Sequence, residues 1–253
     1  MFYRFYDTLF ADKDYAGEIQ RALALGGIAQ PARRVLEIGS GTGGHTLACA
    51  RCGHHVVGVE VDARMVELAE QKRAALPEEL HARIRYFHGR VEDLADEGFD
   101  IALALFNVVN YLGTLAALQT FLAAIAQRLR PGASLVCDAW NGVAALLDPP
   151  RDKETLVETA THTLRTMVHG RTDPMALRTV LHYTLEAQDK ATARRERGTH
   201  ELVQTLWPAK VIAEAAELAG LDMLGVHPLG DTSRAATDKD WKILLLARRR
   251  AER

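Results

Sequence analysis

The sequence is poor in cysteine and in aromatic residues, and neither sign of charge dominates it. Only 3 of its 253 residues are cysteine, and the formal net charge is -2. Three cysteines are too few for a disulfide framework, so a reducing compartment is expected and the cytoplasm is the predicted location. The nearly neutral charge gives no general attraction to nucleic acid or to anionic membranes, so neither is an expected partner.

Long apolar runs and metal-binding patterns are also missing. The N-terminal stretch MFYRFYDTLFADKDYAGEIQ contains acidic residues and no unbroken apolar run, so it predicts neither a secretory signal nor a membrane span. Cys49 and Cys52 form a CxxC, but no second Cys or His pair stands at zinc-finger spacing. We therefore expect no metal site, and interpret the small residues around this CxxC as a helix packed on a sheet.

Apolar, β-branched segments alternate with helical patterns through the first part of the chain. The strand candidates are RRVLEIG, HHVVGVE, RIRYFHG, FDIALALF and ASLVCDAW. This alternation predicts crossover connections and a doubly wound α/β fold with a mostly parallel sheet. Pro131 and Gly132 follow a helical pattern that ends in basic residues, so they predict a helix stop and a strand that begins at Ala133.

The pattern changes between residues 148 and 205. Thr, Val, Leu and His recur there with partial period-two alternation, which predicts antiparallel strands. A helix closed by Gly220 and two further strand candidates then restore the α/β pattern. We predict one domain made of residues 1–147 and 206–253, interrupted at 148–205 by an inserted β-rich lid for substrate binding or oligomerisation. Such an insertion offers a strand edge for pairing, so a homodimer is one expectation.

The segment VLEIGSGTGGHT carries the strongest local signal. A predicted strand runs into Gly39, Gly41, Gly43 and Gly44 and at once opens a helix. Glycines allow a sharp turn and a close approach to a ligand, and the free N–H groups of a helix start attract an electron-rich group. The next predicted strand ends at Glu60, whose carboxylate can accept hydrogen bonds from both hydroxyls of a ribose. Together these features predict a nucleoside site.

The glycine spacing alone leaves two interpretations open. Gly39, Gly41 and Gly44 also satisfy the GxGxxG pattern of dinucleotide enzymes, so an NAD-dependent oxidoreductase is the alternative. A protein that binds the cofactor without catalysing a reaction is a third possibility.

The wider arrangement resembles the class I S-adenosylmethionine-dependent methyltransferase family. The matching features are Glu37, the GSGTG loop, Glu60 and the LRPGASLVCDAW approach to the fifth strand, within residues 33–140. The resemblance implies a seven-stranded sheet in the order 3-2-1-4-5-7-6 with the seventh strand antiparallel, and WKILLLARR is similar to that strand. It also implies S-adenosyl-L-methionine as the cofactor. Glu37 would reach the cofactor's amino group through the loop or a water, or would cap the loop.

The same resemblance assigns roles around the adenosyl group. Residues 39 to 43, including Gly39, Ser40, Gly41 and Gly43, would wrap the methionine and ribose portions, and Glu60 would hold the ribose hydroxyls.

The adenine side departs from the family pattern at one position. Val61 and Met65 would border the ring, and the backbone N–H of Val91 would donate to it. Relatives usually have an aspartate where this chain has Arg90, and arginine cannot accept a hydrogen bond from the adenine amino group. Glu92 or a backbone carbonyl would take that role, or stacking and shape would hold the ring.

The fourth strand candidate ends in FNVVNYL, at the edge where ligands bind in doubly wound sheets. This places Phe106, Asn107, Asn110 and Tyr111 beside the cofactor, with Phe106 as a cofactor contact. Family members that methylate adenine, cytosine amino groups or glutamine have Asp or Asn before Pro-Pro and an aromatic residue here. This chain lacks that motif, which argues against those acceptors and against a nucleic-acid methyltransferase, a further alternative.

YRFYDTLFADKDYAGEI, FNVVNYL and CDAWNG together are similar to small-molecule N-methyltransferases, especially those acting on nucleotide-linked amino sugars, and less closely to glycine N-methyltransferase. In these relatives an N-terminal segment folds over the cofactor, so Tyr6 and Tyr15 would lie near its methionine end. Trp140 and Asn141 would line the acceptor pocket. We therefore expect methyl transfer to a nitrogen, less readily an oxygen, of a small molecule.

Transfer from a sulfonium needs alignment and desolvation more than a strong catalytic group. An amine acceptor must, however, arrive unprotonated, so a nearby side chain has to accept a proton. His200, where the predicted lid returns to the core, is the first candidate for this base. Tyr111 and Asn107 are the other catalytic candidates, and Asn141 is a further rival. A structural hydrogen-bonding role is the competing interpretation of His200.

Overall fold

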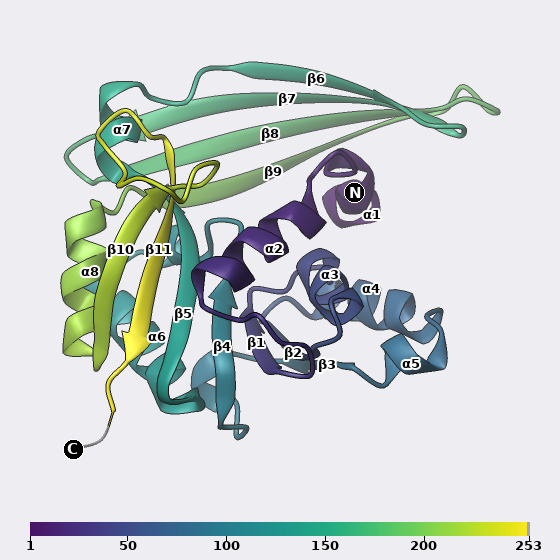
Figure 1. Ribbon diagram of the computed structural model, residues 1–253. Coiled ribbons are helices and arrows are strands. Elements are labelled where there is room, and N and C mark those ends of the chain that lie inside the picture. Colours follow the sequence, from purple (N-terminus) through teal and green to yellow (C-terminus); the bar gives the residue numbers. More distant parts are fainter. Residues whose placement is uncertain (252–253) are drawn as a thin grey trace.

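The computed structural model describes residues 1–251 and contains two β-sheets (Figure 1). The first part of the chain consists of α1 (Phe2–Leu9), α2 (Tyr15–Leu25), β1 (Arg34–Ile38), α3 (Gly44–Arg51), β2 (His55–Glu60), α4 (Ala63–Ala74), α5 (Glu78–His81), β3 (Ile84–His88), the 3-10 helix η1 (Val91–Asp93) and β4 (Phe99–Ala104). The remainder consists of η2 (Val108–Tyr111), α6 (Leu115–Arg128), β5 (Leu129–Trp140), α7 (Gly142–Leu147), β6 (Lys153–Glu158), β7 (His162–Asp173), β8 (Arg178–Asp189), β9 (Arg195–Thr205), α8 (Ala209–Leu218), β10 (Leu221–Pro228) and β11 (Lys242–Arg249).

The larger sheet has seven strands in the order β10-β11-β5-β4-β1-β2-β3. Strands β1 to β5 pair in parallel, whereas β11 is antiparallel to both of its neighbours. This confirms the predicted α/β class and the strand order 3-2-1-4-5-7-6, because β10 and β11 are the sixth and seventh strands of this sheet. The carboxyl ends of the parallel strands therefore lie along one edge.

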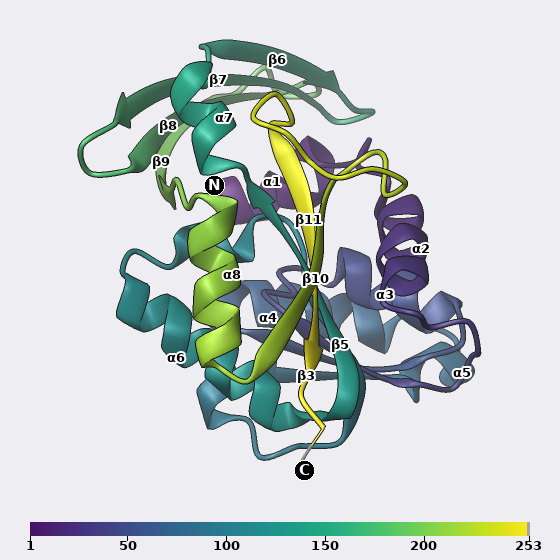
Figure 2. The same cartoon turned by 60° about the vertical axis from the view of Figure 1, so that its left-hand side comes forward.

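Helices cover both faces of this sheet (Figure 2). Leu36 of β1 packs in a cluster with residues of α6 and α8, whereas the preceding Val35 packs in a second cluster with residues of α2 and α3. Both side chains are completely buried, as alternation requires of a strand covered on two sides. Each large apolar side chain buried in this way stabilises the fold by about 1.5–3 kcal/mol.

The smaller sheet is an antiparallel meander in the order β6-β7-β8-β9, here called the lid. It lies across the edge of the larger sheet at which the parallel strands end (Figure 1). Its inner face carries Leu164 and Leu185, which pack against Phe5 of α1. Its outer face carries ion pairs such as that of Arg165 with Glu154. The proposed division of the chain into two domains remains a prediction.

The predicted start of the fifth strand was wrong. Strand β5 begins at Leu129 rather than at Ala133, directly after α6. Leu129 pairs with Phe99, but Ser134 pairs with Ile101, so β5 has extra residues at this point. Gly132 has a φ of +79°, which lets the bulged strand bend, and a bulge is a position where a strand tolerates proline. The Pro-Gly pair thus marks a bulge as well as the end of the helix.

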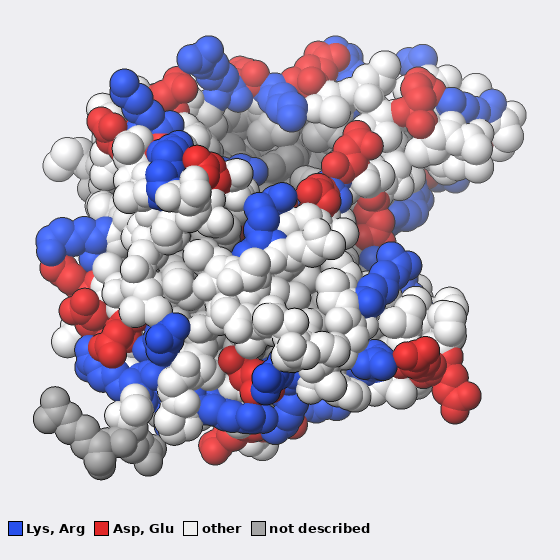
Figure 3. Space-filling model, viewed as in Figure 1, with Lys and Arg blue, Asp and Glu red and all other residues white. Residues whose placement is uncertain are grey.

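No helix within residues 1–251 is both long and apolar enough to cross a membrane. Cys49 and Cys52 are free thiols, the first buried and the second exposed. Basic and acidic residues are intermingled over the face shown in Figure 3, and the surface there is hollowed between the lid and the rest of the chain.

Candidate functional site

The turn between β1 and α3 uses glycine where other residues would not fit. Gly39 and Gly43 have φ values of +72° and +83°, in the left-handed region that favours glycine. A Cβ on Gly39 would lie 2.5 Å from a methyl group of Val108, and a Cβ on Gly43 would lie 2.0 Å from the hydroxyl oxygen of Tyr86. The predicted loop therefore forms, packed between the β4 side and the β3 side of the sheet.

Glu60, at the end of β2, lies directly beside this loop. Its carboxylate accepts the N–H of Gly41 at 2.8 Å and the N–H of Asp62 at 3.0 Å. Each oxygen therefore uses one acceptor position on the main chain and retains another for a ligand hydroxyl. The loop and the carboxylate thus fit the adenosyl group of S-adenosylmethionine in the way that the resemblance implies.

Glu37 is buried under the loop and bonds to the following helix. It accepts a hydrogen bond from the hydroxyl of Thr46, and its Oε1 lies 3.8 Å from Nδ1 of His45. Burial raises the pKa of Glu37 to about 7, against the opposing effects of His45 and Thr46. These contacts place Glu37 where it supports the start of α3; its predicted contact with the cofactor's amino group stays a prediction.

Helix α1 lies over the loop and connects it to β2. Asp7 accepts a hydrogen bond from Thr42 at 2.5 Å, and the hydroxyl of Tyr3 donates to Asp62 at 2.7 Å. The hydroxyl of Tyr6 lies 4.0 Å from the position that a Cβ on Gly41 would occupy. Tyr6 is thus brought to the loop, and its contact with the cofactor stays a prediction.

A polar cluster follows α1 at the start of α2. Lys13 bonds to Glu18 at 2.6 Å, and Glu18 also lies 2.7 Å from Nε2 of His45. Burial opposes ionisation of Glu18, but hydrogen bonds from His45 and Lys13 outweigh it and lower its pKa to about 2. The ammonium group of Lys13 sits 4.3 Å from the ring centre of Phe106, a cation–π distance. Tyr15 packs edge-to-face on His45 at 4.8 Å, so it lies at the helix start behind the loop.

The segment that follows β4 has an unusual backbone. Phe106 and Asn107 have φ values of +75° and +63°, in the left-handed region that non-glycine residues seldom adopt. The N–H of Asn107 donates to Asp138 of β5 at 2.6 Å. The ring of Phe106 packs edge-to-face on Phe10 at 5.2 Å. Phe106 is therefore brought beside the N-terminal segment, and the side-chain oxygen of Asn107 is buried without a hydrogen-bond partner.

The side-chain amide of Asn110 bonds to the main chain rather than lining an open pocket. Its side chain is fully buried, donates to the carbonyl of Thr205 at 2.7 Å and accepts from the N–H of Trp140 at 2.9 Å. It thereby connects the ends of β5 and β9, the points at which the lid joins the larger sheet. The prediction that Asn110 lies at the carboxyl edge of the sheet holds, but its amide is already bonded.

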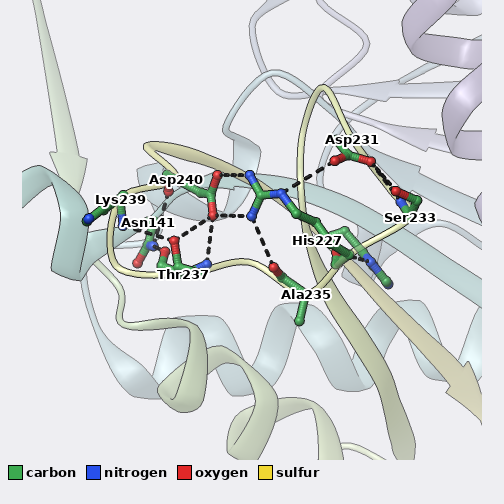
Figure 4. Close-up of polar contacts among 9 residues, drawn as sticks. Asn141, His227, Asp231, Ser233, Ala235, Thr237, Lys239 and Asp240 are labelled. Atoms are coloured by element: carbon green, nitrogen blue, oxygen red, sulfur yellow. Dashed lines mark hydrogen bonds and ion pairs between the residues drawn. The ribbon is translucent and has the colours of Figure 1, made fainter.

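Asn141 has a similar role on the other side of β5 (Figure 4). Its amide donates to the carbonyls of Thr237 and Asp240 at 2.9 and 3.1 Å. Asp240 also forms a two-point ion pair with Arg234, at 2.6 and 2.8 Å. Asn141 therefore anchors the loop between β10 and β11.

Trp140, the neighbouring candidate for the acceptor pocket, packs its ring against Trp241 at 4.6 Å.

The predicted adenine contacts are distributed around the β2–α4 and β3–η1 turns. Val61 is exposed, Met65 is half-buried on α4, and Val91 is buried in η1. The carboxylate of Glu92 lies 3.6 Å from the guanidinium group of Arg90. The carbonyl of Glu92 accepts a hydrogen bond from Arg128. Which acceptor replaces the family aspartate, the side chain of Glu92 or a backbone carbonyl, stays a prediction.

The predicted base, His200, lies on the inner side of the lid against α1. Its ring stacks on Phe2 with a centroid distance of 4.4 Å and an interplanar angle of 15°. Burial lowers the pKa of His200, and the charge of Asp62 acts against that shift. A histidine with a lowered pKa is neutral near pH 7 and so is able to accept a proton.

Tyr111 lies in η2, and Tyr183 lies in the middle of β8, where its ring packs edge-to-face on Phe2 of α1 at 5.8 Å. Desolvation raises the pKa of Tyr111, against a hydrogen bond with Gln204, and raises that of Tyr183 to about 12. Both phenols are therefore protonated at neutral pH and do not act as bases there.

Several residues around the site were not predicted, notably Asp138, Lys13 and Asp62. Asp138 had a local signal, because it is the charged residue of an otherwise apolar strand, ASLVCDAW. A charged group in such a strand must have buried partners. Lys13 and Asp62 gave no comparable signal, since their partners lie in other segments.

The fold and the geometry of the loop are those expected of a methyltransferase, and comparison with known proteins supports the same class. Residues 35–132 match the family model described as a methyltransferase domain. This match, together with the structural neighbours below, confirms the predicted resemblance to S-adenosylmethionine-dependent methyltransferases.

Individual relatives show the same resemblance over different lengths. The chain is 32% identical over 78 residues to the magnesium-protoporphyrin O-methyltransferase of Rhodobacter capsulatus, which is 31% of this chain and 34% of that protein. It thus spans about a third of the length of that relative.

Several solved structures match nearly the whole chain. The sugar N-methyltransferase KedS8 from Streptoalloteichus sp. superposes with a TM-score of 0.78 at 22% identity and covers 97% of this chain and 92% of that chain. CalS10 with bound S-adenosylmethionine, an amino pentose methyltransferase from Micromonospora echinaspora, has a TM-score of 0.67 at 25% identity, covering 93% and 90%.

Proposed function

We propose that this protein transfers a methyl group from S-adenosylmethionine to a nitrogen of a small molecule, and that the acceptor is a nucleotide-linked amino sugar. The observation that carries the proposal is the extent of the structural similarity. The matches to a sugar N-methyltransferase and to an amino pentose methyltransferase cover 97% and 93% of the chain, and therefore include the lid. The near-neutral charge supports a small-molecule acceptor rather than nucleic acid. The scarcity of cysteine supports a cytoplasmic enzyme.

Bound S-adenosylmethionine supplies a methyl group on a positively charged sulfur. An amine nitrogen can bond to this methyl carbon in line with the carbon–sulfur bond, which breaks as S-adenosylhomocysteine leaves. In this proposal Gly41 and its neighbours in the loop hold the methionine and ribose portions. Glu60 accepts hydrogen bonds from the ribose hydroxyls at the acceptor positions that its two main-chain bonds leave free. Helix α1 excludes water from above through Tyr6, and desolvation of this kind favours transfer between bound groups.

The chain must also accept a proton from the acceptor nitrogen. We assign this role to His200, since its lowered pKa keeps the ring neutral near pH 7. Tyr111 and Asn107 would orient the acceptor, Tyr111 as a donor because its pKa is raised. Residues 148–205 would form the outer wall of the acceptor site.

The test is a matched pair of acceptors incubated with the purified protein and S-adenosylmethionine. One is a nucleotide-linked amino sugar, and the other is the same compound with a hydroxyl in place of the amine. We expect S-adenosylhomocysteine and a methylated product, measured by mass spectrometry, with the amine alone. Methylation of the hydroxyl compound would overturn the assignment to nitrogen, and methylation of free amino acids but neither sugar would overturn the acceptor class. A protein that does not bind S-adenosylhomocysteine in calorimetry would overturn the methyltransferase proposal itself.

A further inference from the structure

Asp138 is a charged residue in one of the most apolar strands of the chain. It is 3% exposed, and its neighbours along β5, Cys137 and Ala139, are buried as well. A carboxyl group in such a position is costly unless hydrogen bonds compensate for the lost hydration. Its partners therefore indicate what it is for.

The partners are main-chain N–H groups at the end of β4. Oδ1 of Asp138 accepts a hydrogen bond from the N–H of Asn107 at 2.6 Å, and the N–H of the preceding Phe106 also faces this carboxylate. These two residues are the successive pair with positive φ, +75° and +63°. Strained backbone of this kind persists only where surrounding contacts hold it, and the carboxylate of Asp138 supplies those contacts.

The left-handed pair controls how three segments meet. It turns the chain so that Val108 packs directly on Gly39, where an added Cβ would lie 2.5 Å from the valine methyl group. It also directs the ring of Phe106 toward Phe10 and Lys13, at 5.2 and 4.3 Å. The glycine loop, the N-terminal segment and the β4 segment therefore take their relative positions from this turn.

We propose that Asp138 is a positioning residue of the cofactor site, which it shapes by holding the main chain of Phe106 and Asn107. The inference rests on the proposed function, since it assumes that the glycine loop and Phe106 bind S-adenosylmethionine. Asp138 is 3% exposed, so in this proposal it is a positioning residue and not a contact of the cofactor or the acceptor. It acts through the turn that presses Val108 against Gly39 and places Phe106.

The chain offers a matched control on the same strand. Ser134 is likewise buried on β5, and its hydroxyl bonds to the carbonyl of Gly26 at 3.0 Å, toward the opposite end of the sheet. Ser134→Ala thus removes a buried hydrogen bond of β5 without touching the turn after β4. Asp138→Ala removes the carboxylate that the turn bonds to, whereas Asp138→Asn keeps one side-chain oxygen as a weaker, uncharged acceptor.

The experiment measures S-adenosylhomocysteine affinity by calorimetry, and hydrogen exchange of residues 105–112 by mass spectrometry, in the parent and these three variants. We expect Asp138→Ala to weaken binding by at least about tenfold and to speed exchange in this segment, and Asp138→Asn to weaken binding by roughly threefold. Ser134→Ala is expected to lower the melting temperature while leaving the affinity unchanged. A purely structural role of Asp138 predicts that same result for Asp138→Ala.

Two outcomes would overturn the inference alone. One is a parent and an Asp138→Ala variant that bind S-adenosylhomocysteine equally well, and the other is an equal loss of affinity in Ser134→Ala. If Asp138→Ala does not fold, Asp138→Asn decides the matter, because unchanged affinity and unchanged exchange in that variant would refute the positioning role. A parent that does not bind the ligand would overturn the proposed function, and this inference with it.

Discussion

Replacing Glu60 by alanine tests how the protein recognises the ribose. The carboxylate accepts two main-chain bonds, from Gly41 at 2.8 Å and Asp62 at 3.0 Å, and has acceptor positions left for ligand hydroxyls. A hydrogen bond to a charged group contributes about 1.5–3 kcal/mol. We therefore expect Glu60→Ala to weaken binding of S-adenosylhomocysteine by roughly ten- to a hundredfold in calorimetry.

Loss of affinity alone would not separate a ribose contact from a role in shaping the loop, since Glu60 also holds Gly41. An analogue of S-adenosylhomocysteine without the ribose 2′-hydroxyl resolves this. The parent is expected to bind the analogue less tightly than S-adenosylhomocysteine, whereas Glu60→Ala binds the two alike. Glu67→Ala, an exposed carboxylate on nearby α4, controls for the change in charge. Equal discrimination between the two ligands by the parent and Glu60→Ala would refute the ribose contact.

Three further predictions concern stability. The pKa of Glu37 is about 7 in the folded protein, against an ordinary value of 4.5. Ionisation of Glu37 therefore destabilises the fold progressively as the pH rises between these two values, by up to about 3 kcal/mol. Glu37→Gln should therefore lose less stability than the parent between about pH 5 and about pH 8 in urea unfolding, and parallel losses would contradict this. Asn110→Ala leaves the buried carbonyl of Thr205 without its donor, so a fall of several degrees in melting temperature is expected, and an unchanged value would argue against the junction role. Arg234→Met removes the ion pair to Asp240, so limited proteolysis should cut residues 229–241 faster, with S-adenosylhomocysteine affinity unchanged; equal cutting rates would show that the pair does not hold the loop.

Short-range patterns predicted the turn at the glycine loop and the position of Glu60 beside it. The left-handed conformations of Gly39 and Gly43 follow from a strand that must turn within a few residues into a helix. The position of Glu60 beside the loop follows because neighbouring parallel strands end at the same edge. Both inferences need only local sequence and the order of the strands.

Long-range polar contacts could not be predicted in this way. The sequence predicts that Asn107, Asn110 and Asn141 lie at the carboxyl edge of the sheet. It does not predict in which direction each side chain points. Asn110 pairs with a residue 95 positions away, and Asn107 takes its main-chain partner, Asp138, from 31 positions away. Which amide faces a ligand and which bonds to the main chain depends on packing between distant segments. Composition and periodicity do not predict that packing.

Helix α1 contacts both the cofactor loop side of the larger sheet and the lid. On its lower side Tyr3 bonds to Asp62 at the tip of β2, and on its upper side Arg4 pairs with Glu196 of the lid at 2.8 Å while Phe2 stacks on His200. In the proposed enzyme, a displacement of this helix to admit the cofactor would also break its contacts with β9. Cofactor exchange and the shape of the proposed acceptor site would then be coupled through the eight residues of this helix.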